Sequence, residues 1–118
     1  MLMGMARVLI AEPDPDVRLL IGQVIQRMGH EALPFSPAGL ATADAALVEP
    51  ASQQGAAALA ALRDAPRRVP TVLASIAEIE PEAAGTPAVH VAKPFTVAEL
   101  EDALERALAG GGLPAAGT

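Results

Sequence analysis

The sequence predicts a three-layer α/β fold, in which helices cover both faces of one open, parallel, five-stranded sheet. The first observation is a set of short, continuously apolar runs such as Val8–Ala11, which lack the alternation of a strand with one wet face. The second is that helical patterns alternate with these runs along the chain. The third is that the runs end at polar residues or prolines. Right-handed crossovers then favour the strand order 2-1-3-4-5.

Length and composition exclude several classes of protein. The chain has 118 residues, which suits one domain with a real core, and its net charge of −6 argues against a nucleic-acid surface. It has no cysteine, which excludes disulfides and thiol nucleophiles. No apolar run reaches the length of a membrane span, and Met1–Met5 is too short for a signal peptide. We therefore expect a cytoplasmic protein that binds neither nucleic acid nor membrane.

The first strand and helix follow directly from local signals. Strand Arg7–Ala11 runs into an acidic turn, where Asp14 is a good helix N-cap and Pro15 suits the first helical position. Gly29 follows the helix, where a left-handed C-terminal cap is expected. The inward face of this helix has apolar residues at helical spacing, namely Val17, Leu20, Ile21, Val24, Ile25 and Met28.

The middle of the chain is predicted in less detail. Glu31–Phe35 is the second strand, and Leu40–Ala46 leaves room for two helical turns at most. The third strand, Ala45–Val48, ends in Glu49 and a proline. A loop over residues 51–55 then leads into a helix over 56–63. The second helix of the fold is therefore expected to be short.

The last third of the chain completes the sheet. Strand Thr71–Ala74 ends at Ser75, and prolines and a glycine between Ile76 and Pro87 leave only a shortened fourth helix. The fifth strand covers Ala88–Ala92. Thr96 and Glu99 have the spacing of a capping box at the start of the closing helix. Residues 110–118 are expected to be a flexible C-terminal tail or linker stub, which leaves 1–109 as the domain.

Polar residues converge at one edge of this sheet. Glu12 and Asp14 follow the first strand, Glu49 the third, Ser75 the fourth and Lys93 the fifth. In the order 2-1-3-4-5 the winding direction reverses between strands 1 and 3, and such folds place their chemistry in the crevice beside this point. The sequence therefore predicts a site of acids, a hydroxyl and an amine at the carboxyl ends of the strands.

From Arg7 to about Leu108 the chain resembles the receiver domain of two-component response regulators, the CheY-like superfamily. The most specific match is Val91–Phe95, which is similar to the signature in which a lysine, here Lys93, precedes a cis-proline, here Pro94. The stretch Val8–Arg18 matches the first strand and acidic loop. Ser75 falls where the family has its phosphoryl-binding serine or threonine. The resemblance implies a signalling module that works through protein partners.

Two departures from the family suggest a pseudo-receiver. Glu49 stands where the phospho-accepting aspartate is expected, and the acidic pair reads Glu12-Pro13, so that Pro13 replaces a carboxylate. Because Mg²⁺ requires nearly ideal oxygen geometry, its binding is expected to be weak or absent. The sequence thus favours a non-enzymatic, phosphorylation-independent interaction module without a catalytic residue, metal or cofactor.

Several alternatives stay open. Glu49 is expected to lie close to Lys93, either as a mimic of the phosphorylated state or as a simple salt bridge in an inactive site. The runner-up is a working receiver that accepts a phosphoryl group with Mg²⁺, with Asp14 as a substitute metal ligand. A small hydrolase or nucleotide enzyme is less favoured, because the chain has neither a nucleophile elbow nor a phosphate-binding glycine loop.

The remaining predictions concern switching and partners. His90 stands where receivers have a switch aromatic and could report pH, or it is simply a half-exposed strand residue. The partner is expected to be a signalling protein, and a homodimer through the strand 5 and last-helix face is a further option. Glu78, Glu80 and Glu82 are either a solvated loop or an acidic docking edge.

Overall fold

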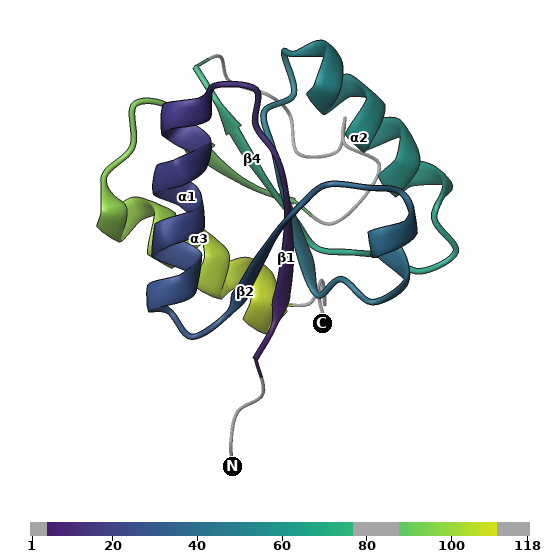
Figure 1. Ribbon diagram of the computed structural model, residues 1–118, viewed down its shortest axis with the longest axis horizontal. Coiled ribbons are helices and arrows are strands. Elements are labelled where there is room, and N and C mark those ends of the chain that lie inside the picture. Colours follow the sequence, from purple (N-terminus) through teal and green to yellow (C-terminus); the bar gives the residue numbers. More distant parts are fainter. Residues whose placement is uncertain (1–4, 77–87, 111–118) are drawn as a thin grey trace.

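The computed structural model describes residues 5–76 and 88–110 and contains one parallel sheet with strand order β2-β1-β3-β4-β5 (Figure 1). The predicted fold class and strand order are confirmed. The strands are β1 (Arg7–Ala11), β2 (Glu31–Pro34), β3 (Ala45–Val48), β4 (Thr71–Ser75) and β5 (Ala88–Ala92). The helices are α1 (Pro15–Arg27), the 3₁₀ helix η1 (Ala38–Ala41), α2 (Gln53–Asp64) and α3 (Val97–Gly110).

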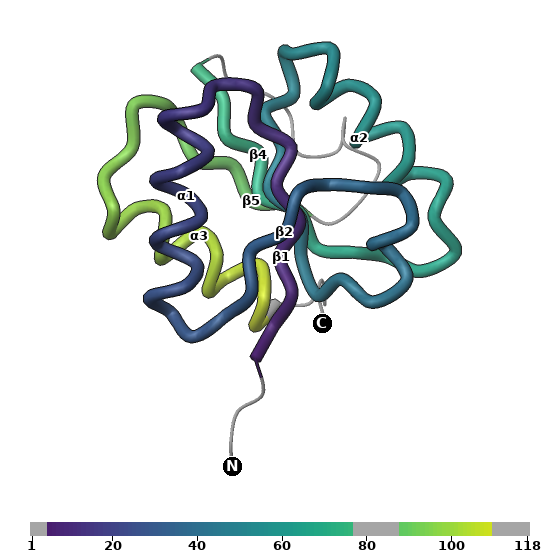
Figure 2. The backbone as a smooth tube through the Cα atoms, in the orientation of Figure 1, coloured from purple at the N-terminus to yellow at the C-terminus, as the bar shows by residue number. Residues whose placement is uncertain are grey.

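The helices form layers on both sides of the sheet. In Figure 1, α1 and α3 lie together on one face, and α2 covers the other. Figure 2 follows the chain from β1 into α1 and from β3 into α2 at the same end of the sheet, as parallel strands require. The connections that leave the carboxyl ends of β1 and β3 therefore contribute to a single edge of the molecule.

The core consists of two clusters that share the strands. Val8 and Ile10 of β1 face α1 and α3, whereas Leu9 and Ala11 face α2 and η1. Successive residues of a strand point to opposite faces, and both faces are covered here, which explains why the buried strand positions are apolar apart from Thr71 and Ser75 of β4. One prediction is wrong: Leu20, expected on the inward face of α1, is 37% exposed.

The predicted helix signals around α1 and α3 are confirmed. The Asp14 side chain accepts hydrogen bonds from the backbone N–H groups of Asp16 (2.9 Å) and Val17 (3.3 Å) at the start of α1. Gly29, just past the end of α1, has a φ of 89°, which glycine adopts without strain. At α3 the hydroxyl of Thr96 accepts from the N–H of Glu99 (3.1 Å), whose carboxylate accepts from the N–H of Thr96 (2.9 Å). These contacts satisfy N–H groups that a helix start leaves unpaired.

The connections differ from prediction in three places. Helix α2 begins at Gln53 rather than at residue 56, because Ser52 caps it and accepts a hydrogen bond from the N–H of Gly55 (2.8 Å). β2 ends at Pro34, one residue early. The link from β2 to β3 contains only η1, which is four residues long and overlaps the predicted segment 40–46 only at residues 40 and 41.

A guanidinium group supports this short link. Arg67 Nη1 donates hydrogen bonds to the carbonyl oxygens of Leu40 (2.8 Å) and Ala43 (2.9 Å). The expected shortened fourth helix, the acidic loop residues Glu78, Glu80 and Glu82, and residues 111–118 of the expected tail lie outside the described ranges. Within those ranges, no helix combines the length and the apolar character that crossing a membrane requires.

Candidate functional site

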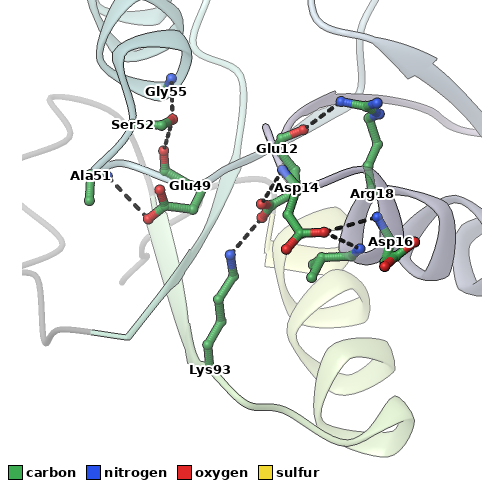
Figure 3. A network of polar contacts seen from close by, with 10 residues as sticks. Glu12, Asp14, Asp16, Arg18, Glu49, Ala51, Ser52, Gly55 and Lys93 are labelled. Atoms are coloured by element: carbon green, nitrogen blue, oxygen red, sulfur yellow. Dashed lines mark hydrogen bonds and ion pairs between the residues drawn. The ribbon is translucent and has the colours of Figure 1, made fainter.

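The carboxyl ends of four strands meet at one edge, as the sequence predicts from their parallel direction. Glu12 follows β1, Glu49 follows β3, Ser75 ends β4, and Lys93 follows β5. Figure 3 shows Glu12 and Lys93 close to Asp14, which precedes α1, and Glu49 beside the residues that lead into α2. The contacts inside this group decide what it can do.

Glu12 is the buried centre of the site, with only 1% of its surface exposed. Its Oε1 atom forms an ion pair with Lys93 Nζ at 2.8 Å, and its Oε2 atom accepts a hydrogen bond from the N–H of Asp14 at 3.1 Å. A buried carboxylate is tolerated only where charge and hydrogen bonds compensate for lost water. Both oxygens of Glu12 are therefore engaged by the protein itself.

The ion pairs and hydrogen bonds of the described residues include no direct contact between Glu49 and Lys93, and the water-bridged contact that was equally expected stays a prediction. Its Oε2 atom accepts a hydrogen bond from the N–H of Ala51 at 3.1 Å, and Figure 3 shows its carboxylate next to Ala51. Among the described residues, the ion pair of Lys93 is with Glu12 instead. The physical reason is local: an N–H two residues along the chain satisfies Glu49, whereas the more deeply buried Glu12 needs the cation.

The turn after Glu49 is tied to the start of α2. Ser52 Oγ donates to the carbonyl oxygen of Glu49 (3.0 Å) and accepts from the N–H of Gly55 (2.8 Å). A Cβ atom on Gly55 would overlap the same carbonyl oxygen, so that only glycine fits there. We did not predict Ser52 or Gly55 as parts of this region. Serine is a favoured N-cap, and this signal in the sequence could have located the helix start.

The other residues around the acidic loop stabilise the start of α1 and the loop itself, or make no polar side-chain contact. The Asp14 carboxylate caps the helix, and Pro13 is exposed and has no side-chain oxygen. Arg18, which the sequence did not single out, donates from Nη1 to the carbonyl oxygen of Glu12 at 3.0 Å. The loop is thus held by its own side chains and backbone.

This donor set does not fit the Mg²⁺ ion that the resemblance to receivers implies. The metal requires several oxygen ligands in near-octahedral geometry. Glu12 is already neutralised by Lys93, Asp14 caps a helix, and Pro13 supplies nothing. In residues 5–76 and 88–110, no three His, Cys, Asp or Glu side chains are grouped so as to hold a metal.

The ends of β4 and β5 are joined through the backbone. Ser75 is 1% exposed, and its carbonyl oxygen accepts a hydrogen bond from the N–H of Lys93 at 3.0 Å. The peptide bond between Lys93 and Pro94 is cis. This arrangement places the lysine beside the ends of β1 and β4.

His90 lies away from the strand-end group. It pairs with Leu73 in the sheet register, three residues before Lys93, and it is half-buried. Its Nε2 atom is buried and has no hydrogen-bond partner among the described residues. The structure therefore brings Glu12, Asp14, Glu49, Ser75 and Lys93 to one edge but leaves His90 in the middle of β5.

No family model and no curated protein matches the sequence. Among solved structures it is similar to NtrX from Brucella abortus in complex with ADP (TM-score 0.74, 23% identity), covering 92% of this chain and 27% of that one. It is also similar to the chemotaxis response regulator CheY4 of Vibrio cholerae (TM-score 0.73, 22% identity), covering 89% of this chain and 100% of CheY4. A beryllofluoride-activated NtrC receiver domain gives a TM-score of 0.67 at 21% identity, covering 91% of this chain and 97% of that one.

These similarities define the class of fold. The chain has the five-stranded CheY-like α/β fold, and the solved structures that share it include receiver domains of response regulators. The chain spans about 27% of the NtrX chain, whereas it matches CheY4 over the full length of that protein.

Proposed function

We propose that this protein is a pseudo-receiver, a non-enzymatic module that binds a signalling protein in a two-component-type system without being phosphorylated. The observation that carries the proposal is the closed state of Glu12, whose two carboxylate oxygens contact Lys93 and the N–H of Asp14. A receiver needs such groups to be available for a metal ion and a phosphoryl group. Here the carboxylate of Glu12 and the ammonium group of Lys93 are paired with each other.

The site also lacks other groups that phosphoryl transfer needs. The reaction depends on a metal ion to neutralise the charge that develops on the phosphoryl oxygens. Pro13 removes one carboxylate from the acidic loop, and Glu49 places a longer side chain where the acceptor aspartate is expected. These substitutions support a site that has lost phosphoryl chemistry while the fold around it is kept.

The position of Glu49 also bears on the two alternatives that the sequence left open. A mimic of the phosphorylated state would direct its charge at Lys93, but Glu49 contacts the N–H of Ala51. Lys93 is instead paired with Glu12 across 81 positions of sequence. This geometry supports a fixed scaffold rather than permanent mimicry.

We assign the partner protein to the face formed by β5 and α3. A groove of about 260 Å³ lies there, lined in part by Pro94, Glu99, Asp102 and Arg106. Its mixture of charged and apolar groups suits a protein surface, because interfaces combine an apolar centre with a polar rim. A homodimer through this same face is the other form of this assignment.

The central test is phosphorylation of the intact protein. Wild type is incubated with acetyl phosphate and Mg²⁺, and intact-mass analysis is expected to show no added phosphoryl group. The double variant Pro13→Asp, Glu49→Asp restores both acids and is expected to gain a Mg²⁺-dependent phosphoryl group, with the two single variants as controls.

Each outcome of this experiment is informative. Uptake of a phosphoryl group by wild type would overturn the proposal and favour the working receiver. A double variant that stays unmodified would show that the loss of chemistry does not lie in these two positions.

A further inference from the structure

The outer side of α1 exposes apolar surface that nothing in the described chain covers. Leu19 is 62% exposed and Leu20 is 37% exposed. The surface is hollowed on both sides of the helix, by about 400 Å³ next to Leu20 and Arg27 and by about 740 Å³ next to Leu19 and Leu33. Single exposed leucines are common, but here Leu19 borders one hollow and Leu20 the other, so that an apolar side chain lies beside each of them, as on a contact surface.

Charged residues stand at the two ends of this surface. Asp16, Leu20, Gln23 and Arg27 follow one another at intervals of four, three and four residues, which keeps them on one side of the helix. We call these four residues the α1 stripe. Asp16 lies in the first turn and Arg27 in the last. At 1.5 Å per residue they are about 16 Å apart, too far to pair with each other.

Neither of the two charged side chains is part of an ion pair within the described residues. Among the described residues the ion pairs join Arg7 to Glu31, Lys93 to Glu12 and Arg106 to Asp102, and none involves Asp16 or Arg27. Both residues are exposed. Their charges are therefore available to another molecule.

We propose that the α1 stripe is a self-association site, in which two copies of the chain pack their α1 helices antiparallel about a two-fold axis. The axis passes between Leu20 and Gln23, so that Asp16 of each copy faces Arg27 of the second copy. A two-fold interface must be self-complementary, and a stripe with an acid at one end and a base at the other meets that condition.

The middle of the stripe is compatible with the same arrangement. Leu20 loses water when the second helix covers it. The Gln23 amide has both donors and acceptors, so two copies can hydrogen-bond to each other across the axis.

The β5–α3 face lacks this property. Arg106 already contacts Asp102 of its own helix, at 3.5 Å, and Glu99 adds a further negative charge beside them. Two copies meeting there would oppose like charges unless that pair opened. Charge complementarity therefore favours α1 as the face for a second copy.

A simpler explanation of the charges exists and can be tested. An acid near a helix N-terminus and a base near its C-terminus are favourable in an isolated helix, because they complement the helix dipole. That explanation predicts a stability effect of Asp16 and Arg27 but no effect on the mass of the particle in solution.

The experiment is a charge-swap complementation. Sedimentation equilibrium of the full chain is measured from about 1 µM to about 1 mM, the range of weak interfaces, at ~0.15 M salt, where the net repulsion of two acidic copies is screened. Wild type is expected to show a concentration-dependent monomer–dimer equilibrium. Asp16→Arg and Arg27→Asp alone each oppose like charges twice and are expected to weaken the dimer about tenfold or more.

The mixture of the two variants distinguishes the explanations. Asp16→Arg mixed with Arg27→Asp restores both charge pairs, so a heterodimer is expected at wild-type concentrations. Arg106→Asp is the matched control with the same charge change on α3, and it is expected to leave the dimer unchanged. Circular dichroism confirms that each variant is folded.

Four results would overturn the proposal. The first is a wild type that stays monomeric at every concentration. The second is a dimer that survives both single variants, and the third is a dimer that is lost in Arg106→Asp, because either dimer would use another face. The fourth is a mixture that fails to recover the dimer although both variants are folded.

Discussion

At the scale of single residues, Lys93 acts here as an internal cation for Glu12. The lysine side chain is 18% exposed and the glutamate 1%, so the carboxylate depends on the ammonium group more than the reverse. The pair also joins the ends of β1 and β5, which are 81 positions apart in the sequence. One contact thus satisfies the buried charge and fixes two loops.

Lys93→Met is expected to lower the free energy of unfolding by about 2 kcal/mol, because it leaves a buried carboxylate without its cation. The loss should be smaller than the ~3–5 kcal/mol of a fully buried pair, since water reaches part of Lys93. Urea unfolding followed by circular dichroism measures it. The double variant Glu12→Gln, Lys93→Met serves as the control and should recover most of the loss. A single variant within ~0.5 kcal/mol of wild type would mean that the pair contributes little.

Sequence reasoning at this scale found the members of the site but not their pairing. Glu12, Glu49 and Lys93 were placed at one edge because parallel strands end together. Which acid takes the lysine depends on which one finds a closer donor, and the N–H of Ala51 satisfies Glu49. Such a choice depends on loop geometry that no residue pattern specifies.

At the scale of elements, α2 packs closely against the end of β3 because Gly55 has no side chain. Gly55 is buried in the first turn of the helix, against the carbonyl group of Glu49. Glycine is normally unfavourable inside a helix. Here it permits a backbone contact that any other residue would push apart.

Gly55→Ala is therefore expected to destabilise the protein, by about 1–3 kcal/mol, although alanine is the better helix former. Gly22→Ala on α1 is the matched control, because nothing lies within 4 Å of the added methyl group. The control should stabilise the protein by ~0.5–1 kcal/mol. Thermal unfolding shows whether each of the two substitutions stabilises or destabilises the protein. A stabilising Gly55→Ala would show that α2 can move away from β3 at no cost in stability.

The elements were predicted well where local signals are strong. Asp14, Gly29 and the Thr96–Glu99 pair mark helix ends by their own chemistry, and each acts as expected. We predicted the start of α2 too late in the sequence, because we expected Gly55 to lie in the preceding loop. Its buried contact with Glu49 is a tertiary effect that a sequence pattern does not show.

At the scale of the whole molecule, two cores share one sheet. Residues of a strand alternate between the cluster under α1 and α3 and the cluster under α2 and η1. The clusters are therefore coupled through the same backbone. The Glu12–Lys93 ion pair adds a fixed contact at the edge where both layers meet.

Together with the proposed loss of phosphorylation, which would leave no signal to favour a second state, this coupling predicts a single dominant conformation. Relaxation-dispersion NMR should find little microsecond-to-millisecond exchange at the amides of Ser75 and Lys93. His90, in the middle of β5, provides a probe away from the site. Widespread exchange through all three residues would instead indicate a switch that some ligand controls.

The edge strand β2 has a consequence for behaviour at high concentration. Glu31 and Phe35 direct their backbone N–H groups to β1. The backbone nitrogens of the alternate residues, Ala32 and Pro34, therefore point to the open side of β2. Proline has no N–H, which leaves Ala32 as the only outward backbone donor on this strand. An unprotected edge is a template for another chain to pair with, and proline at an edge blocks that pairing. The residue that ends β2 thus also protects this side of the sheet from growing into a fibril.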